Sequence, residues 1–190
     1  GAPSDALMLL TFTNKAAGEM RERLRARLPD DIKLPWIGTF HSFGNRMLRM
    51  YGERIGVPKN ATLMDAEDAA RMLDALLAAA FPDKGRRLDA MSVYETICAH
   101  GLDVTAEEDR EAIEALCGNG GFAGHTRRSL LEAFKRYESE KRRAAVLDFS
   151  DLILLPGRVL RRPADLRARL QARLRDVTVD EAQETDGAQF

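Results

Sequence analysis

Apolar positions in the first part of the chain form short continuous runs, and a segment with helical spacing follows each run. Residues 6–12 (ALMLLTF) have the composition of a strand buried on both faces in a parallel sheet. A helix is expected directly after it, with Thr13 or Asn14 as the capping residue and Pro29 beyond its last turn. The apolar positions of this helix recur every four residues, at Ala16, Met20, Leu24 and Leu28.

The same order of elements is repeated once. Residues 36–40 (WIGTF) predict a second strand, and the helix after it has Phe43, Met47 and either Met50 or Tyr51 on one face. A strand, a helix, a strand and a helix in succession are typical of an α/β domain with a parallel sheet.

After the turn sequence at 56–58 (GVP), the pattern is helical as far as about residue 162, and no segment predicts a strand. We therefore expect a helical module inserted into the α/β unit. The first predicted helix lies between the cap Asp65 and the stop Pro82, and the second covers residues 90–99. The third runs from Thr105, with its capping-box partner Glu108, to Gly118. The fourth is long, carries Leu130 to Tyr137 and ends near Arg143, and the fifth begins near Asp148 and is bent or broken at Pro156.

A short amphipathic helix after Pro163 leads into residues 176–180 (DVTVD), where β-branched residues return and the sheet is expected to resume. The predicted organisation is a first α/β part over residues 1–55, a helical subdomain over 56–162 and a return to the α/β part over 163–190. The predicted fold class is accordingly α/β, with a parallel sheet and a predominantly α-helical inserted subdomain.

Composition and charge limit the function classes. Hydrophobic residues make up 45% of the 190 residues and charged residues 31%, which supports a packed core and excludes wholesale disorder. The formal net charge of −1 gives no global attraction to nucleic acid. Residues 127–143 carry seven basic and three acidic side chains, and residues 158–175 carry seven and one. These patches are either solvated helix faces or contacts to a phosphate backbone.

Cys98 and Cys117 lie 19 residues apart without a Cys-x-x-Cys motif or a histidine pair, so neither a disulfide framework nor a zinc site is indicated. No apolar run approaches the length of a membrane span, and we expect a cytoplasmic protein without a membrane partner. The chain does not begin with Met and ends shortly after a predicted strand, which favours an internal piece of a longer protein.

The clearest candidate for chemistry is the sequence VTVDEAQ at 177–183, an apolar strand that ends in two carboxylates. At the carboxyl end of a parallel strand, Asp180 would be able to hold Mg²⁺ through its water shell, and Glu181 to orient or deprotonate an attacking water. This pattern suggests nucleotide hydrolysis. The alternative is an ordinary acidic turn at a strand end.

Two further candidates lie where a predicted strand turns into a helix, at 11–17 (TFTNKAA) and 38–43 (GTFHSF). Free backbone N–H groups at a helix start can seat a phosphate, and Phe12, if exposed, would stack on a base. The alternatives are a capped turn with a buried Phe12, and a structural hydrogen-bonding role for His41.

Taken together in this order, these segments resemble the UvrD/Rep (PcrA-like) family of superfamily 1 DNA helicases. TFTNKAAGEM resembles motif Ia of that family, GTFHSF motif Ib, and VDEAQETDGAQF motif II, the Walker B segment. LDFSDL at 147–152 resembles the segment that closes the family's helical 1B insertion. The resemblance covers essentially the whole chain and implies a RecA-like motor domain 1A with an inserted 1B subdomain.

The resemblance also implies roles for individual residues. Asp180 would be the Mg²⁺-associated carboxylate, Glu181 would activate the hydrolytic water, and Gln183 would lie near the phosphates of ATP. The single-stranded DNA track would be lined by Phe12, Thr13, Asn14, Thr39, His41 and Ser42. Members of the family couple ATP hydrolysis to 3′ to 5′ translocation on single-stranded DNA and to unwinding at duplex junctions, which here implies a role in DNA repair or replication.

The sequence also departs from the family pattern. Ala182 stands where an aromatic residue is usual, and Glu184 and Gly187 alter the continuation of motif II. No Gly-x-x-x-x-Gly-Lys-Ser/Thr occurs, and GNGGFAG at 118–124 lacks the Lys-Ser/Thr of a P-loop. The family's P-loop strand would precede residue 1, so we expect an incomplete RecA-like sheet and no ATPase activity of the isolated chain.

Two alternatives stay open. The runner-up within the same superfamily is the helicase subunit of a recombination-type helicase-nuclease, which shares these motifs and would differ by a nuclease domain in its C-terminal sequence. A protein of another class, a helical protein-interaction module with a vestigial nucleotide site, is the second alternative. The intact pair of Asp180 and Glu181 argues against such decay.

Overall fold

The computed structural model of the chain describes residues 3–161, 164–185 and 189. The described residues fall into two compact units, which we call unit 1 (up to Ile55 and from Leu155 to Thr185) and unit 2 (Gly56–Leu154, together with Gln189). The second boundary between the units lies between Leu154 and Leu155, within a helix. The sequence instead places this boundary at residue 162, which lies outside the described residues. The predicted assignment of the three segments to subdomains stays a prediction.

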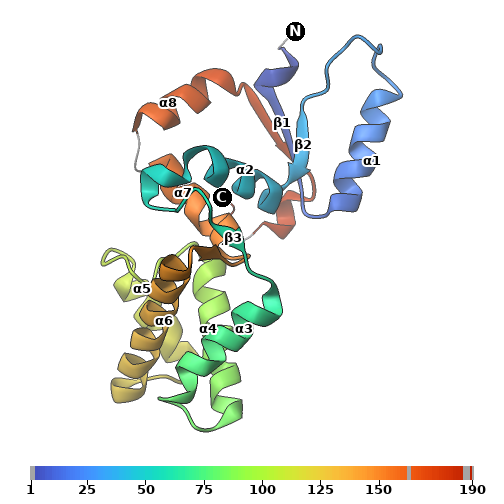
Figure 1. Ribbon diagram of the computed structural model, residues 1–190. Helices are drawn as coiled ribbons and strands as arrows, with labels where there is room; N and C mark the ends of the chain where they lie inside the picture. The colour runs from blue at the N-terminus through green and yellow to red at the C-terminus, as the bar shows by residue number, and fades with distance from the viewer. Residues whose placement is uncertain (1–2, 162–163, 186–188, 190) are drawn as a thin grey trace. The chain divides into compact units, whose positions relative to one another are not determined.

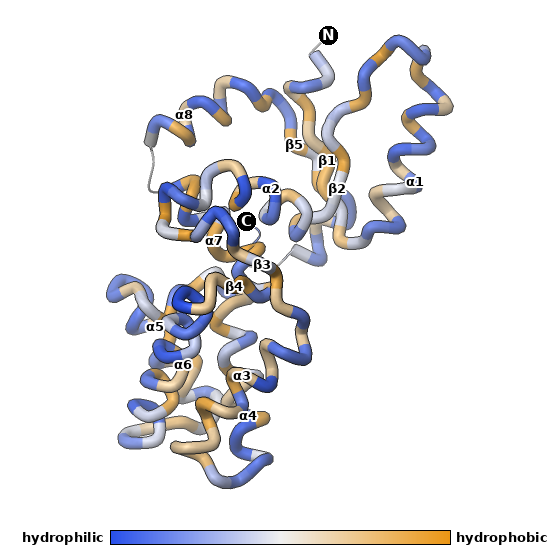
Figure 2. The backbone as a smooth tube through the Cα atoms, in the orientation of Figure 1, coloured by the Kyte–Doolittle hydropathy of each residue, from blue (hydrophilic) through white to orange (hydrophobic). Residues whose placement is uncertain are grey.

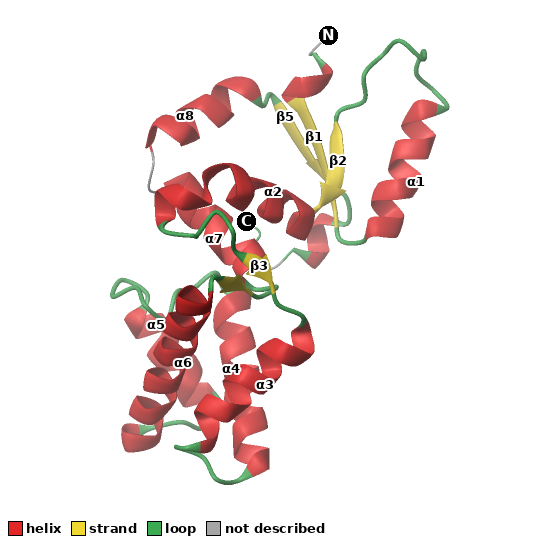
Figure 3. Cartoon of the chain, in the orientation of Figure 1, coloured by secondary structure: helices red, strands yellow, loops and turns green. Residues whose placement is uncertain are grey.

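Unit 1 is built on a three-stranded parallel sheet with the order β2-β1-β5 (Figures 1 and 3). The strands are β1 (Leu7–Thr11), β2 (Trp36–Thr39) and β5 (Asp176–Val179). In the centre, β1 pairs with both neighbours, and Leu10 lies opposite Gly38 on one side and Val179 on the other. All three predicted strands and the α/β class are confirmed.

The helices of unit 1 cover both sides of this sheet, with α1 on one side and α2 and α8 on the other (Figure 1). Arg54 of the 3₁₀ turn after α2 holds α8 through an ion pair with Asp165, 2.9 Å between Nη1 and Oδ2. The helical elements are η1 (Ser4–Ala6), α1 (Asn14–Arg25), α2 (Phe40–Tyr51), η2 (Gly52–Ile55), α8 (Ala164–Arg173) and η3 (Ala182–Glu184).

Helix α7 (Asp151–Arg161) passes through the division between the units and continues through Pro156. Of the two predicted alternatives, a bend or a break at this proline, the break is therefore wrong, and the bend stays a prediction. Proline removes one N–H donor from the helix. The buried side chains of Leu155 and Val159 on either side of Pro156 keep an apolar face along the helix.

Unit 2 is helical, as predicted, and encloses its own apolar core. Figure 2 shows that hydrophobic and hydrophilic positions alternate along its helices, which are α3 (Ala66–Ala78), α4 (Lys84–Ala99), α5 (Arg110–Asn119) and α6 (Gly124–Ala144). The side chains of Leu77, Ile97, Cys117 and Phe134 have no exposed area and belong to one continuous cluster.

Two short strands in unit 2 contradict the prediction that this region contains none. They are β3 (Thr62–Leu63) and β4 (Val146–Leu147), and they pair in parallel. The Thr62 N–H donates to the Ala145 carbonyl at 3.0 Å, and the Met64 N–H to the Leu147 carbonyl at 2.8 Å. Two residues are too few to produce a period in the sequence, so these strands could not be found from the hydrophobic pattern.

Helix boundaries in unit 2 also differ from the prediction. Helix α5 begins at Arg110 and not after Thr105, because the Thr105 N–H and hydroxyl both donate to the Asp103 carboxylate. Helix α4 begins at Lys84, six residues earlier than predicted, because the Asp83 side chain caps it by accepting the Arg86 N–H. Local hydrogen bonds of Asp and Thr thus decide both starting points.

A buried charge cluster closes one end of unit 2. Lys141 of α6 is 2% exposed, and its Nζ lies 2.8 Å from Asp148, 2.9 Å from Asp151 and 2.9 Å from Glu138. The Tyr137 hydroxyl also donates to Asp148 at 2.8 Å. The backbone N–H groups of Asp148 and Asp151 each donate to the other residue's carboxylate. Every charge in this cluster therefore has a partner, as buried charges require.

The pKa values of the cluster follow from burial and mutual charge. Burial alone would lower the pKa of Lys141, but its three carboxylate neighbours outweigh burial and raise that pKa. Burial raises the pKa of Asp151 to about 7, although the nearby ammonium group acts in the opposite direction. Burial and then the Asp148 charge raise the pKa of Cys98 to about 12. Lys141 is therefore the cation that permits three carboxylates to be buried together.

We predict that Lys141→Met destabilises unit 2 by about 3–5 kcal/mol, because three buried carboxylates lose their common cation. Lys135→Met, at an exposed position of the same helix, is the matched control and should change stability by less than about 0.5 kcal/mol. Urea unfolding followed by far-ultraviolet circular dichroism measures both variants. Equal unfolding midpoints for the two variants would contradict a structural role of the cluster.

Candidate functional site

The carboxyl ends of β1, β2 and β5 meet at one edge of the sheet because all three strands run parallel (Figure 3). Thr11 lies opposite Thr39, and Leu10 lies opposite Val179. The residues that follow these strands, from Phe12, Phe40 and Asp180 onwards, therefore leave the sheet at the same edge. All three sequence motifs that predicted nucleotide and DNA chemistry are brought to this edge.

The end of β5 presents the two predicted catalytic carboxylates. The Asp180 N–H donates to the Leu10 carbonyl at 2.9 Å, which fixes Asp180, half-buried, at the strand end beside β1. Glu181 is exposed and has φ +52° and ψ 45°, the left-handed region that a residue with a Cβ seldom adopts. Gln183, also exposed, donates from Nε2 to Oε2 of Glu181. The turn thus directs the chain sharply away from the strand immediately after Asp180.

The β1–α1 connection is a capped turn. Thr13 is the N-cap of α1, and its Oγ1 accepts the Ala16 N–H at 3.1 Å. The buried Thr11 hydroxyl supports the turn by donating to the Thr13 carbonyl at 2.9 Å. Asn14 and Thr13 are exposed at the helix start. Phe12 is half-buried, with its ring centroid 5.5 Å from that of Phe40, so only part of its surface is accessible.

The β2–α2 connection is a complete capping box. The Ser42 N–H donates to Thr39 Oγ1 at 3.1 Å, and the Thr39 N–H donates to Ser42 Oγ at 2.8 Å. Thr39 is 7% exposed, whereas His41 and Ser42 are exposed. The side chain of Thr39 therefore stabilises the start of α2 and has little surface to offer a ligand.

Gly38 makes this connection possible by leaving space. An added Cβ would lie 2.7 Å from the Trp36 ring and 2.7 Å from Ser42 Oγ. The Trp36 ring covers this position and contacts Phe43 edge to face, with 5.9 Å between centroids. Neither Gly38 nor Trp36 was among the predicted site residues. A glycine inside a predicted strand was the available signal, since it marks a close approach.

The donor groups at the sheet edge fit an incompletely enclosed Mg²⁺ ion. In the described part of the chain, no three His, Cys, Asp or Glu side chains converge as a metal cage. Mg²⁺ keeps several waters and is commonly bound by one or two carboxylates together with substrate phosphates. A single half-buried Asp180 at a strand end is compatible with that mode of binding.

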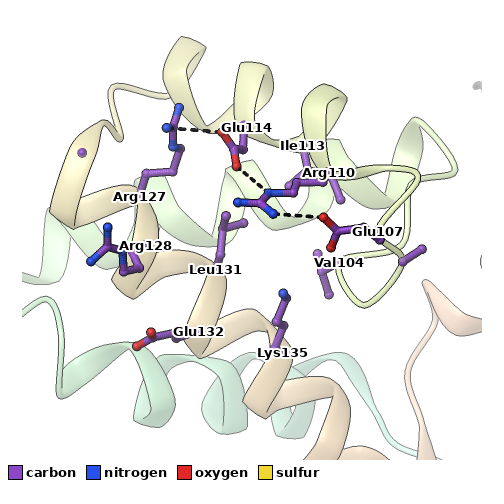
Figure 4. Close-up of a pocket in the computed structure, with 12 residues that line it drawn as sticks. Val104, Glu107, Arg110, Ile113, Glu114, Arg127, Arg128, Leu131, Glu132 and Lys135 are labelled. Atoms are coloured by element: carbon purple, nitrogen blue, oxygen red, sulfur yellow. Dashed lines mark hydrogen bonds and ion pairs between the residues drawn. The ribbon is translucent and has the colours of Figure 1, made fainter.

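The basic patch at 127–143 is less available than its sequence suggests. Figure 4 shows part of it in a groove of about 400 Å³ between α5 and α6, where Arg127 pairs with Glu114 and Glu114 with Arg110. Lys141 is buried, and Arg143 pairs with Glu140. The exposed basic side chains of this patch that have no ion-pair partner among the described residues are Arg128, Lys135, Arg136 and Arg142.

The sequence of the chain matches a known protein family over its whole length. The sequence profile of the UvrD/REP helicase N-terminal domain matches residues 1–190. The chain belongs to the UvrD/REP helicase family. Its relatives include the ATP-dependent DNA helicase PcrA of Leuconostoc citreum, at 32% identity over 187 residues, and DNA helicase II of Haemophilus influenzae, at 29% identity over 195 residues. A third is the ATP-dependent DNA helicase UvrD1 of Mycobacterium tuberculosis, at 31% identity over 185 residues.

These UvrD/REP relatives are much longer than the chain. Each alignment covers 97% of the chain but only 24%, 25% and 23% of the respective relative. The chain therefore spans about a quarter of the length of the curated relatives it matches. Within the described residues, no helix is both long enough and apolar enough to cross a membrane.

We predict that Gly38→Ala lowers the free energy of unfolding of unit 1 by about 1–3 kcal/mol, because the new methyl group overpacks the space held by Trp36 and Ser42. Gly18→Ala is the control, since a Cβ at that helical position meets nothing within 4 Å and should stabilise by about 0.4–1 kcal/mol. Trp36 is the one tryptophan of the chain, so its fluorescence during urea unfolding reports on unit 1. Gly38→Ala unfolding at the same midpoint as Gly18→Ala would contradict this packing.

Proposed function

We propose that the chain is the part of an ATP-dependent DNA helicase that supplies the acidic edge of the ATP site and part of the single-stranded DNA track. The longer protein would couple ATP hydrolysis to 3′ to 5′ translocation and duplex unwinding, in DNA repair or replication. The observation that carries this proposal is the placement of Asp180 and Glu181 at the end of β5, directly beside β1. The β1–α1 connection that follows β1 contains the sequence that resembles motif Ia.

Asp180 would hold Mg²⁺ through water, and the ion would neutralise charge on the ATP phosphates. Glu181 is exposed and lies two residues beyond the end of β5, where its carboxylate would orient a water and accept its proton. Gln183 donates to this carboxylate and would hold its orientation. This contact supports a positioning role for Gln183 beside its expected place near the phosphates.

The single-stranded DNA track would use the starts of α1 and α2. Each start presents backbone N–H groups that face away from its own helix, a favourable environment for phosphate. Asn14, His41, Thr13 and Ser42 are exposed there and would contact the DNA directly. Thr39 would contribute by fixing the start of α2, and Phe12 would offer only its accessible edge to a base.

We predict that Glu181→Gln in the full-length protein lowers the kcat of DNA-stimulated ATP hydrolysis by about 10²–10⁴-fold, because the amide cannot accept the proton of the attacking water. Glutamine keeps the size of the side chain, so ATP binding should be retained. The readout is phosphate release under saturating single-stranded DNA.

Glu184→Gln is the matched control for this variant, since Glu184 is exposed in the same turn and has no assigned role in hydrolysis. It should hydrolyse ATP at the wild-type rate. The isolated 190-residue chain, which contains no P-loop sequence, should show no turnover. Wild-type turnover by Glu181→Gln would reject its assignment as the catalytic carboxylate.

We also predict that His41→Ala combined with Asn14→Ala weakens binding of a fluorescent oligothymidylate by the full-length protein at least tenfold, because two exposed contacts are lost. Glu19→Ala, on the exposed face of α1, is the control and should bind the oligonucleotide as the wild type does. Fluorescence anisotropy at constant salt measures both. Unchanged affinity of the double variant would exclude this edge from the DNA track.

A further inference from the structure

Unit 1 contains a pocket at the opposite end of its strands. The pocket has a volume of about 330 Å³ and is formed by α2, α8 and the amino-terminal ends of β1 and β2. A five-residue strand spans about 17 Å, so this pocket is separated from the carboxyl-end site by the length of the sheet. None of the sequence motifs contributes to it, apart from Phe43 at the end of GTFHSF.

The wall of the pocket is apolar and adaptable. Trp36 and Phe43 form one side through their edge-to-face contact, and Tyr51 extends it. Met47 is 1% exposed and forms part of the floor, whereas Met50 is 51% exposed at the opening. Methionine side chains adjust to different partner shapes, and aromatic residues dominate the binding energy of protein interfaces. Such a wall is suited to receive a large apolar side chain.

The opening of the pocket is positively charged. Lys33, Arg46 and Arg173 line it and are exposed, and Asp5 is the one acidic residue among its lining residues. Within the described residues, no ion pair engages any of these three cations. The formal charge at the opening is therefore +2, and it is available to a ligand.

We infer that this pocket binds an acidic peptide segment of a partner protein, which inserts one large apolar side chain between α2 and α8. Carboxylates that flank the inserted side chain would meet Lys33, Arg46 and Arg173, and charge-assisted hydrogen bonds would fix the register. A nucleic acid is a poorer fit, because Trp36 and Phe43 meet edge to face and therefore offer no continuous stacking platform for successive bases. This inference does not depend on ATP hydrolysis.

Trp36 allows a direct test, because it is the only tryptophan of the chain and lines the pocket. The probe is an acetylated and amidated hexapeptide with a central leucine and phenylalanine between two pairs of aspartates. Titrating it into the 190-residue chain should change the Trp36 emission saturably. Peptides with serine in place of the apolar pair, or lysine in place of aspartate, should bind at least tenfold more weakly.

The matched pair of variants is Arg46→Glu and Arg49→Glu, at neighbouring turns of α2. Arg46 lines the pocket, whereas Arg49 is exposed on the same helix and does not line it. Arg46→Glu should weaken the peptide at least tenfold, and Arg49→Glu should leave its affinity within twofold. Far-ultraviolet circular dichroism shows that both variants are folded.

Three outcomes would overturn the inference. They are the absence of a saturable change up to millimolar peptide, equal affinity of Arg46→Glu and Arg49→Glu, and displacement of the peptide by oligothymidylate with the same sensitivity to Arg46→Glu. The last outcome would assign the pocket to nucleic acid. Failure of the ATPase prediction for Glu181 would leave this test unaffected, because the two sites lie at opposite ends of the strands.

Discussion

The pairing of β1 with both of its neighbours is the constraint on which the candidate site depends. β1 is the central strand, and its backbone bonds to β2 on one side and β5 on the other. Strands β2 and β5 are separated by more than 130 residues, so only this shared neighbour brings Asp180 close to the turns after β1 and β2. The Asp180 N–H to Leu10 carbonyl bond continues that pairing one residue beyond β5. The site is therefore a consequence of strand order.

The N-cap hydrogen bonds of α1 and α2 and the contacts that a ligand would make involve the same short segments of the chain. Thr13 lies just after β1 and Thr39 is the last residue of β2, and the hydroxyl group of each caps the helix that follows. A capped helix start still leaves its first N–H groups free, because the cap satisfies only one or two of four. The structural and the functional interpretations of these motifs are thus compatible: the cap fixes the helix start, and the exposed Asn14 and His41 remain beside it.

The sequence predicted the elements that local periodicity controls, and it missed two short strands, the starts of α4 and α5, and a buried charge cluster that depends on distant partners. The three strands of the sheet and the cap at Asp65 were found because neighbouring residues determine them, and Thr13 was one of the two candidate caps of α1. β3 and β4 were missed because they are two residues long. Lys141 was counted in a basic surface patch, yet it is buried, because it pairs with Asp148 and Asp151, which lie beyond the end of α6 in the sequence. Counting charges along one helix does not reveal ion pairs with a later segment.

The two ends of the parallel sheet differ in electrostatics for one geometric reason. In a unit where helices alternate with parallel strands, helices start at the carboxyl ends of the strands and finish at the amino ends. The partial positive charge of helix starts gathers where α1 and α2 begin, beside Asp180, and the partial negative charge gathers where α2 and α8 end. Arg49 and Arg173 lie in those last turns, where a cation stabilises its helix. Helix stability therefore accounts for Arg173 at the opening of the amino-end pocket. It does not account for Lys33 and Arg46, the other two cations at that opening.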